Sequence, residues 1–146
     1  MKRLGFYLCG QQPVEKVLPQ IARAAKGQGE RLLVVAGDAD LRERLDRELW
    51  EFAPEHFLAH GMADAPHAER QPVLISGKCA APNGAQIVAL ADGQWREEAE
   101  SFERALLFFD EGGRDAARAT WRQFDAREEI AREFFELDNG KWVKRA

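Results

Sequence analysis

The stretch RLLVVAGDADLRERLDRELWEF, residues 31–52, contains the two patterns on which the fold prediction depends. Its first part, Arg31 to Ala36, is a continuous apolar run, which is typical of a strand in a sheet covered on both faces. Its second part predicts an amphipathic helix with a capping box at Asp40 and Glu43. The apolar positions of this helix are Leu41, Leu45, Leu49 and Phe52. A covered strand followed by an amphipathic helix indicates an α/β fold.

The rest of the chain extends this alternation in both directions. Further strands are predicted at residues 4–9, 72–76, 86–90 and 105–109. One further helix is expected after Pro13, with a kink or a late start at Pro19, and a long final helix is expected over residues 113–135. The order predicts a three-layer α/β sandwich with a mainly parallel sheet and nucleotide-binding-like topology, in a single domain over residues 1–146.

Length, charge and cysteine content narrow the functional classes. A chain of 146 residues can bury one sizeable core. The net charge of -4 disfavours a protein that grips duplex DNA by its phosphates. The two cysteines, Cys9 and Cys79, suit a reducing cytosol, and neither a signal peptide nor a membrane-spanning run is apparent. We therefore expect a cytoplasmic protein.

Trp50 lies on the polar side of the predicted helix over residues 38–52. At about 100° per residue it falls roughly opposite the leucine stripe, among Glu43, Asp46 and Arg47. A large indole gains nothing from its own helix on a solvated face. We expect another segment of the chain or a partner to cover it.

The motifs for phosphate chemistry are incomplete. Ser76-Gly77-Lys78-Cys79 contains Gly-Lys, but Pro72 stands where a phosphate-binding loop needs its first glycine, and Cys79 stands where it needs Ser or Thr. The strand that ends at Asp110 and Glu111 resembles a Walker B strand without the matching loop. The alternative function that remains is a degenerate nucleotide-binding enzyme using these two carboxylates, and we expect no cofactor.

Three histidines and one cysteine could be drawn as a metal site: His56, His60, His67 and Cys79. His56 and His60 are four residues apart, yet Pro54 makes a helix there doubtful, and no HExxH or CxxC pattern is present. We interpret them as loop histidines that make ordinary hydrogen bonds, and predict no metal site and no catalytic residue.

The predicted final helix carries a row of arginines beside an indole. Arg114, Arg118 and Arg122 recur every four residues, and Trp121 borders them on the side of Ala117. Arginine forms forked hydrogen bonds with carboxylates, and tryptophan offers a flat contact surface. The row therefore suits a ligand with carboxylates and an aromatic group, although a solvated charged face with Trp121 at the core edge has the same periodicity.

The order of several short motifs resembles the chi subunit family of the bacterial DNA polymerase III holoenzyme. The motifs span nearly the whole chain, and their set in this order is specific although no single one is. They are Phe6-Tyr7-Leu8, Arg44-Leu45-Asp46-x-x-Leu49-Trp50, Pro54-Glu55-x-Phe57-x-x-His60-Gly61, Pro72-Val73-x-Ile75, Phe102-x-Arg104 and Ala117-Arg118-x-x-Trp121.

The resemblance implies a noncatalytic replication accessory subunit of the clamp-loader complex, with a nucleotide-binding-like fold but no nucleotide site. Its implied partners are the psi subunit, through a surface at Phe57, and the acidic, phenylalanine-ended C-terminal tail of single-stranded-DNA-binding protein, so that contact with DNA is indirect. The residues assigned to the tail site are Trp50, Arg118, Trp121 and Phe109, or Phe108 in its place, with Arg114 and Arg122 of the arginine row.

Overall fold

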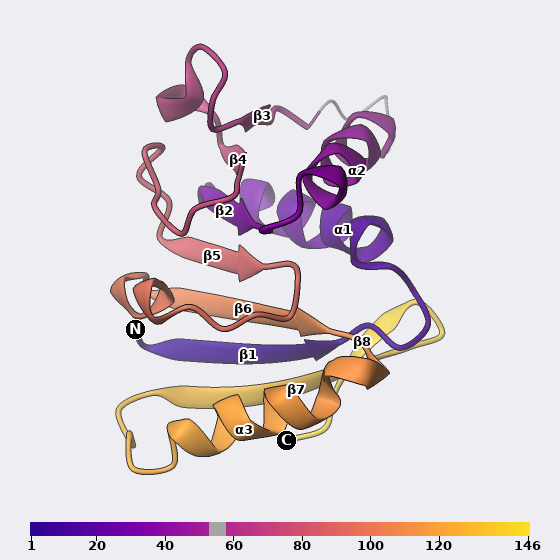
Figure 1. Cartoon of the computed structure of the whole chain (residues 1–146), viewed down its shortest axis with the longest axis vertical. Coiled ribbons are helices and arrows are strands. Elements are labelled where there is room, and N and C mark those ends of the chain that lie inside the picture. Colours follow the sequence, from indigo (N-terminus) through magenta and orange to yellow (C-terminus); the bar gives the residue numbers. More distant parts are fainter. Residues whose placement is uncertain (53–57) are drawn as a thin grey trace.

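The strands of the chain form one continuous sheet in the computed structural model, which describes residues 1–52 and 58–146. The strands are β1 (Arg3–Leu8), β2 (Leu32–Val35), β3 (Gly61–Met62), β4 (Val73–Ser76), β5 (Ile87–Leu90), β6 (Arg104–Phe109), β7 (Ala131–Asp138) and β8 (Lys141–Lys144). Their order across the sheet is β3-β4-β2-β5-β6-β1-β7-β8. Neighbouring strands are parallel except for β7 and β8. The predicted mainly parallel sheet is therefore confirmed (Figure 1).

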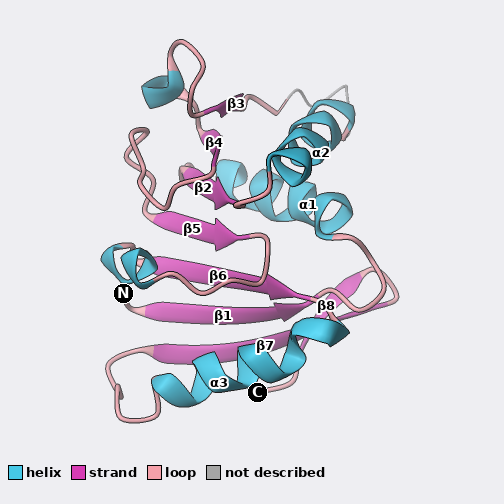
Figure 2. Cartoon of the chain, viewed as in Figure 1, coloured by secondary structure: helices cyan, strands magenta, loops and turns pink. Residues whose placement is uncertain are grey.

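Helices cover both faces of this sheet, as Figures 1 and 2 show. The helices α1 (Val14–Gly27) and α2 (Ala39–Glu51) pack together on one face, and α3 (Arg114–Gln123) lies on the other. Short 3-10 helices occur at η2 (Ala68–Arg70), η3 (Glu97–Ser101) and η4 (Glu111–Gly113). The core accordingly divides into two apolar layers, one on each side of the sheet. The predicted three-layer sandwich is therefore confirmed. Among the described residues, no helix is long and apolar enough to cross a bilayer.

The alternation of side chains along β6 assigns its two phenylalanines to different layers. Phe108 belongs to the layer under α1 and α2, where it stacks on Tyr7 of β1 at 5.0 Å between ring centroids. Phe109 belongs to the layer under α3. Successive strand residues point to opposite faces, so the two rings pack in different layers of the core.

The final helix is shorter than the sequence predicted, and this part of the prediction was wrong. Helix α3 ends at Gln123, and residues 131–138 form strand β7, which pairs in parallel with β1. The turn Asn139-Gly140, with φ of 51° and 77°, reverses the chain into β8. Asn-Gly is a strong hairpin signal because both positions tolerate positive φ, and it was the clue in the sequence to these two strands.

Helix α2 has the predicted apolar face but a different start. Leu41, Leu45 and Leu49 are buried, whereas the cap is Asp38, whose carboxylate accepts a hydrogen bond from the Asp40 backbone N–H at 3.0 Å. The predicted capping box at Asp40 is therefore displaced to this earlier residue. Helix α1 begins at Val14 and continues through Pro19, so the late start that we considered does not occur.

A partly buried carboxylate, that of Asp92, joins the loops that follow β5 and β2. Asp92 accepts two hydrogen bonds from the Arg96 guanidinium, both 2.9 Å long, and one from the Gly37 backbone N–H at 2.9 Å. Burial raises the pKa of this carboxyl, but the hydrogen bonds from Arg96, Gly37 and Gln94 outweigh that effect and hold the pKa below its ordinary value.

Replacing this carboxylate is expected to destabilise the fold in a pH-dependent way. We predict that Asp92→Asn lowers the free energy of unfolding by about 2 kcal/mol at neutral pH, because Arg96 loses its charged partner. A lowered folded-state pKa means that the stabilisation is present above the unfolded pKa and is lost as the pH falls through the folded value. Urea titrations at neutral and strongly acidic pH measure this. A gap between variant and wild type that stayed constant down to the lowest pH would contradict it.

Candidate functional site

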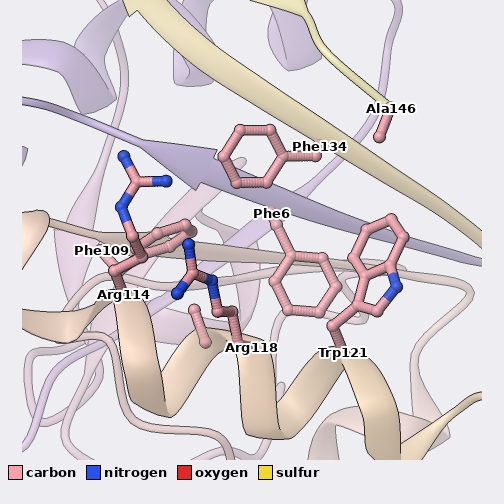
Figure 3. Close-up of a pocket in the computed structure, with 8 residues that line it drawn as sticks. Phe6, Phe109, Arg114, Arg118, Trp121, Phe134 and Ala146 are labelled. Carbon is pink, nitrogen blue, oxygen red and sulfur yellow. The ribbon is translucent and has the colours of Figure 1, made fainter.

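A pocket of about 230 Å³ lies between α3 and the sheet, on the face opposite α1 and α2 (Figure 3). Its lining residues are Phe6, Phe109, Arg114, Ala117, Arg118, Trp121, Phe134 and Ala146. Aromatic rings make up most of the wall, and two arginines are the charged lining residues. The volume is below the 300 Å³ or so at which pockets for small molecules begin, so it suits one large side chain better than a cofactor.

The floor of the pocket comes from three adjacent strands. Phe109 ends β6, Phe6 lies on β1, and Phe134 is the register partner of Phe6 on β7. The rings of Phe109 and Phe134 approach to 6.1 Å between centroids. Because the strands are parallel and in register, residues far apart in the sequence point to one face and form a continuous aromatic surface.

One side of α3 forms the opposite wall. Arg114, Ala117, Arg118 and Trp121 recur at spacings of three and four, which places them along one stripe of the helix. The helix starts directly beside the floor, because η4 follows β6 and the Asp110 carboxylate accepts a hydrogen bond from the Gly113 backbone N–H at 2.9 Å. The end of β6 and this cap together orient the stripe.

The indole of Trp121 is held from two sides. Its ring lies 5.1 Å from the Phe6 ring, centroid to centroid, and the Arg132 guanidinium stacks 4.7 Å over it. Arg132 also donates to the Trp121 carbonyl and pairs with Asp125 at 2.7 Å. Trp121 is thus a preformed wall, and Arg132 is a positioning residue committed to it.

The two lining arginines differ in how far their charges are already paired. Arg114 forms a fork with Glu111, with Nε 2.9 Å from Oε2 and Nη2 2.8 Å from Oε1. Arg118 lies 3.7 Å from the fully exposed Asp115 carboxylate, beyond hydrogen-bond distance. The hydrogen bonds from Arg114 lower the pKa of Glu111, which is therefore a carboxylate at neutral pH. Arg118 is the lining cation better able to receive a new carboxylate.

The structure brings together some of the predicted tail-site residues and separates others. Arg114, Arg118, Trp121 and Phe109 share the pocket, and of the two phenylalanines considered it is Phe109 that lines it. Arg122 is exposed on α3 and is absent from the lining. At about 100° per residue it lies beside Arg118 at the edge of the stripe, and its side chain does not line the pocket.

Trp50 does not share this pocket. It is 52% exposed on α2, which covers the other face of the sheet. Its ring lies 4.6 Å from the ring of buried His60, which sits 3.1 Å from Asp46. The expectation that Trp50 and Arg118 contact one short peptide therefore fails, because the sheet separates their helices. Phe57, assigned to the psi surface, is outside the described residues.

Phe134 and Ala146 were missed by the site prediction. Phe134 was placed within the long final helix, so its alignment with Phe6 could not be foreseen. Ala146 reaches the pocket because its carbonyl accepts a hydrogen bond from the Phe134 backbone N–H at 3.1 Å. The Asn139-Gly140 turn was the available signal, since it returns the chain along β7.

The sheet also has a crevice where nucleotide-binding folds hold their ligands. The adjacent strands β1 and β6 are followed by helices on opposite faces of the sheet, α1 after β1 and α3 after β6. A cavity of about 600 Å³ lies at the carboxyl ends of these two strands. Its charged lining groups are mainly carboxylates: Glu15, Asp38, Asp92 and Asp110, with Arg44 bound to Glu15 at 3.1 Å. Such a lining repels phosphate, and Asp110 already serves as the cap before α3.

Within the described residues, the histidines do not form a metal site with other ligating side chains. The Nδ1 atom of His60 lies 2.8 Å from the Leu58 carbonyl, which is an ordinary loop contact. Across residues 1–52 and 58–146, no three side chains of the ligating types converge on a metal position. His56 is outside those ranges.

Comparisons with known proteins agree with these observations. The family described as DNA polymerase III chi subunit, HolC, matches residues 1–130. The protein named "Probable DNA polymerase III subunit chi" of Rickettsia prowazekii (strain Madrid E) is 20% identical over 117 residues, which are 75% of this chain and 71% of that protein. Phe134 of β7 and Ala146, which complete the pocket, follow the matched region. The resemblance predicted from the sequence is confirmed: this chain belongs to the DNA polymerase III chi subunit family of replication accessory subunits.

Proposed function

We propose that this chain is a noncatalytic adaptor that links the clamp loader, through psi, to the C-terminal tail of single-stranded-DNA-binding protein. The observation that carries the proposal is the pocket under α3, which combines an aromatic floor with an arginine whose charge is weakly paired. That tail is acidic and ends in phenylalanine, so it offers the two chemical groups that this pocket can hold.

The pocket suggests a binding pose for the end of the tail. The terminal phenylalanine ring packs against Phe6, Phe134 and the Trp121 indole, where aromatic rings gain both apolar burial and favourable ring geometry. Its carboxylate meets Arg118 at the rim. A pocket of about 230 Å³ holds the terminal residue, while the preceding residues run across the surface.

Such a contact is expected to be modest in strength and sensitive to salt. Arg118 keeps 58% of its side chain exposed, and ions screen exposed charge pairs. Several tails on one DNA-bound array of the partner raise the effective concentration near the site. The net charge of -4 is compatible with this role, because a local basic rim contacts an acidic peptide while the partner binds the DNA.

Trp50 belongs in this proposal to a second surface. It is the exposed large apolar side chain of the described residues, on the helix that precedes Phe57 in the sequence. We assign Trp50 to the psi interface, the surface to which the family resemblance assigns Phe57, in place of the tail site that the resemblance implies for Trp50. Two surfaces on opposite faces of the sheet allow both partners to bind at once, which an adaptor requires.

The proposal is tested by titrating a labelled acidic peptide that ends in Pro-Phe into the wild-type protein. We expect saturable binding that weakens with added salt, and at least roughly tenfold weaker binding of the same peptide without its terminal phenylalanine, because the aromatic floor then stays empty. Equal binding of both peptides would contradict the assigned pocket. ATP with magnesium and single-stranded DNA are the comparison ligands: binding with turnover of ATP, or a mobility shift of DNA by the protein alone, would favour another function.

A further inference from the structure

We propose that Glu111 competes with the acidic ligand for Arg114. The Glu111 carboxylate occupies the Arg114 guanidinium, so Arg114 binds the ligand only when a second carboxylate of the ligand displaces Glu111. This inference rests on the proposed function, since it concerns the same pocket. It identifies a specificity-determining residue that neither periodicity nor the family motifs point to.

The fork between Glu111 and Arg114 has the geometry of a bound ligand. Two hydrogen bonds, 2.9 and 2.8 Å long, join the guanidinium nitrogens Nε and Nη2 to the two carboxylate oxygens. This is the arrangement by which arginine recognises a carboxylate on a partner molecule. A ligand therefore finds this arginine with its fork already filled.

The other guanidinium groups near the pocket show that this pairing is particular to Arg114. Arg118 is 3.7 Å from Asp115 and has no hydrogen bond to it. Arg132 is committed to Trp121 and Asp125, so it supports the wall and does not face the ligand. The first ligand carboxylate thus goes to Arg118, and a second reaches Arg114 only by displacing Glu111.

Displacement of Glu111 costs little structure. Its side chain is 59% exposed, on a 3-10 turn of three residues, and its side-chain hydrogen bonds in the described chain are those with Arg114. The cap before α3 is made by Asp110, so the turn does not depend on Glu111. Exchange of one carboxylate for another at a partly exposed arginine yields little net free energy. The ligand's second carboxylate therefore adds little affinity while Glu111 is present.

The test compares Glu111→Gln with wild type in titrations of two labelled peptides. One is the acidic peptide ending in Pro-Phe, and the other has its internal acidic residues replaced by the corresponding amides. We expect Glu111→Gln to bind the acidic peptide about fivefold more tightly, since Arg114 is released. The amide peptide should gain less than roughly twofold, because it has no second carboxylate to place there.

Glu129→Gln is the matched control. It removes the same charge and takes a carboxylate partner from Arg127, an arginine that does not line the pocket. Binding should change by less than roughly twofold if only net charge is altered. Equal gains in affinity in both variants would overturn the competitor role of Glu111. Weaker binding by Glu111→Gln would also overturn it, because it would show that Glu111 positions Arg114 for the ligand. Absence of binding by the wild-type protein would instead overturn the proposed function and this inference together. Thermal unfolding of each variant confirms that the fold is retained.

Discussion

Arg118→Ala is expected to weaken binding of the acidic, phenylalanine-ended peptide by roughly ten- to thirtyfold, or about 1.5–2 kcal/mol. The ligand carboxylate then loses its charge-assisted hydrogen bonds, while the aromatic floor stays intact. We place the loss at the lower end of the range for such contacts because the Arg118 side chain is 58% exposed. Fluorescence anisotropy titrations at low and moderate salt measure it, and the salt dependence should become shallower in the variant.

Two residues provide controls for that experiment. Arg122→Ala removes the same group from the same helix, but Arg122 does not line the pocket. Trp50→Ala removes the exposed indole on the other face of the sheet. Both variants should keep affinity within roughly twofold of wild type, since neither side chain meets the peptide. A loss with Arg122→Ala equal to that with Arg118→Ala would show that the helix acts through its overall charge.

Phe108→Ala is expected to destabilise the protein by about 3–5 kcal/mol, the largest change in stability that we predict. Phe108 is 1% exposed on β6, an interior strand of the sheet. Its ring stacks on Tyr7, which in turn stacks on Phe135 at 4.9 Å, so removal opens a cavity next to a cross-strand aromatic row. Urea unfolding followed by circular dichroism measures the change.

A conservative variant separates volume from aromatic stacking. Phe108→Leu retains most of the buried volume and should cost about 1–1.5 kcal/mol. Tail-peptide binding should survive in that variant, because Phe108 faces α1 and α2 while the pocket lies under α3. Destabilisation below about 1 kcal/mol in Phe108→Ala would mean that neighbouring side chains close the cavity, contrary to the limited relaxation expected of a close-packed protein interior.

Local patterns predicted the strands and helices well wherever one period was unambiguous. Continuous apolar runs located β2, β4, β5 and β6, and the leucine stripe located α2 together with the exposure of Trp50. The prediction failed after Gln123. The polar residues around β7 permit a helical interpretation when taken alone, and pairing with β1 and β8 stabilises the strand instead. Long-range pairing of this kind has no local signature beyond the Asn139-Gly140 turn.

The candidate site, too, could be predicted from the sequence only in part. The spacing of Arg114, Arg118 and Trp121 along one helix is a local property, so the chain alone was enough to predict a carboxylate-binding row beside an indole. Which residues face that row depends on strand order and on the face of the sheet that α3 covers. Those long-range contacts bring Phe6 and Phe134 under the helix, select Phe109 over Phe108, and leave Trp50 on the far face. Helical periodicity determines where side chains lie around the axis of their own helix. How two helices lie relative to each other depends on the pairing of strands that are distant in the sequence.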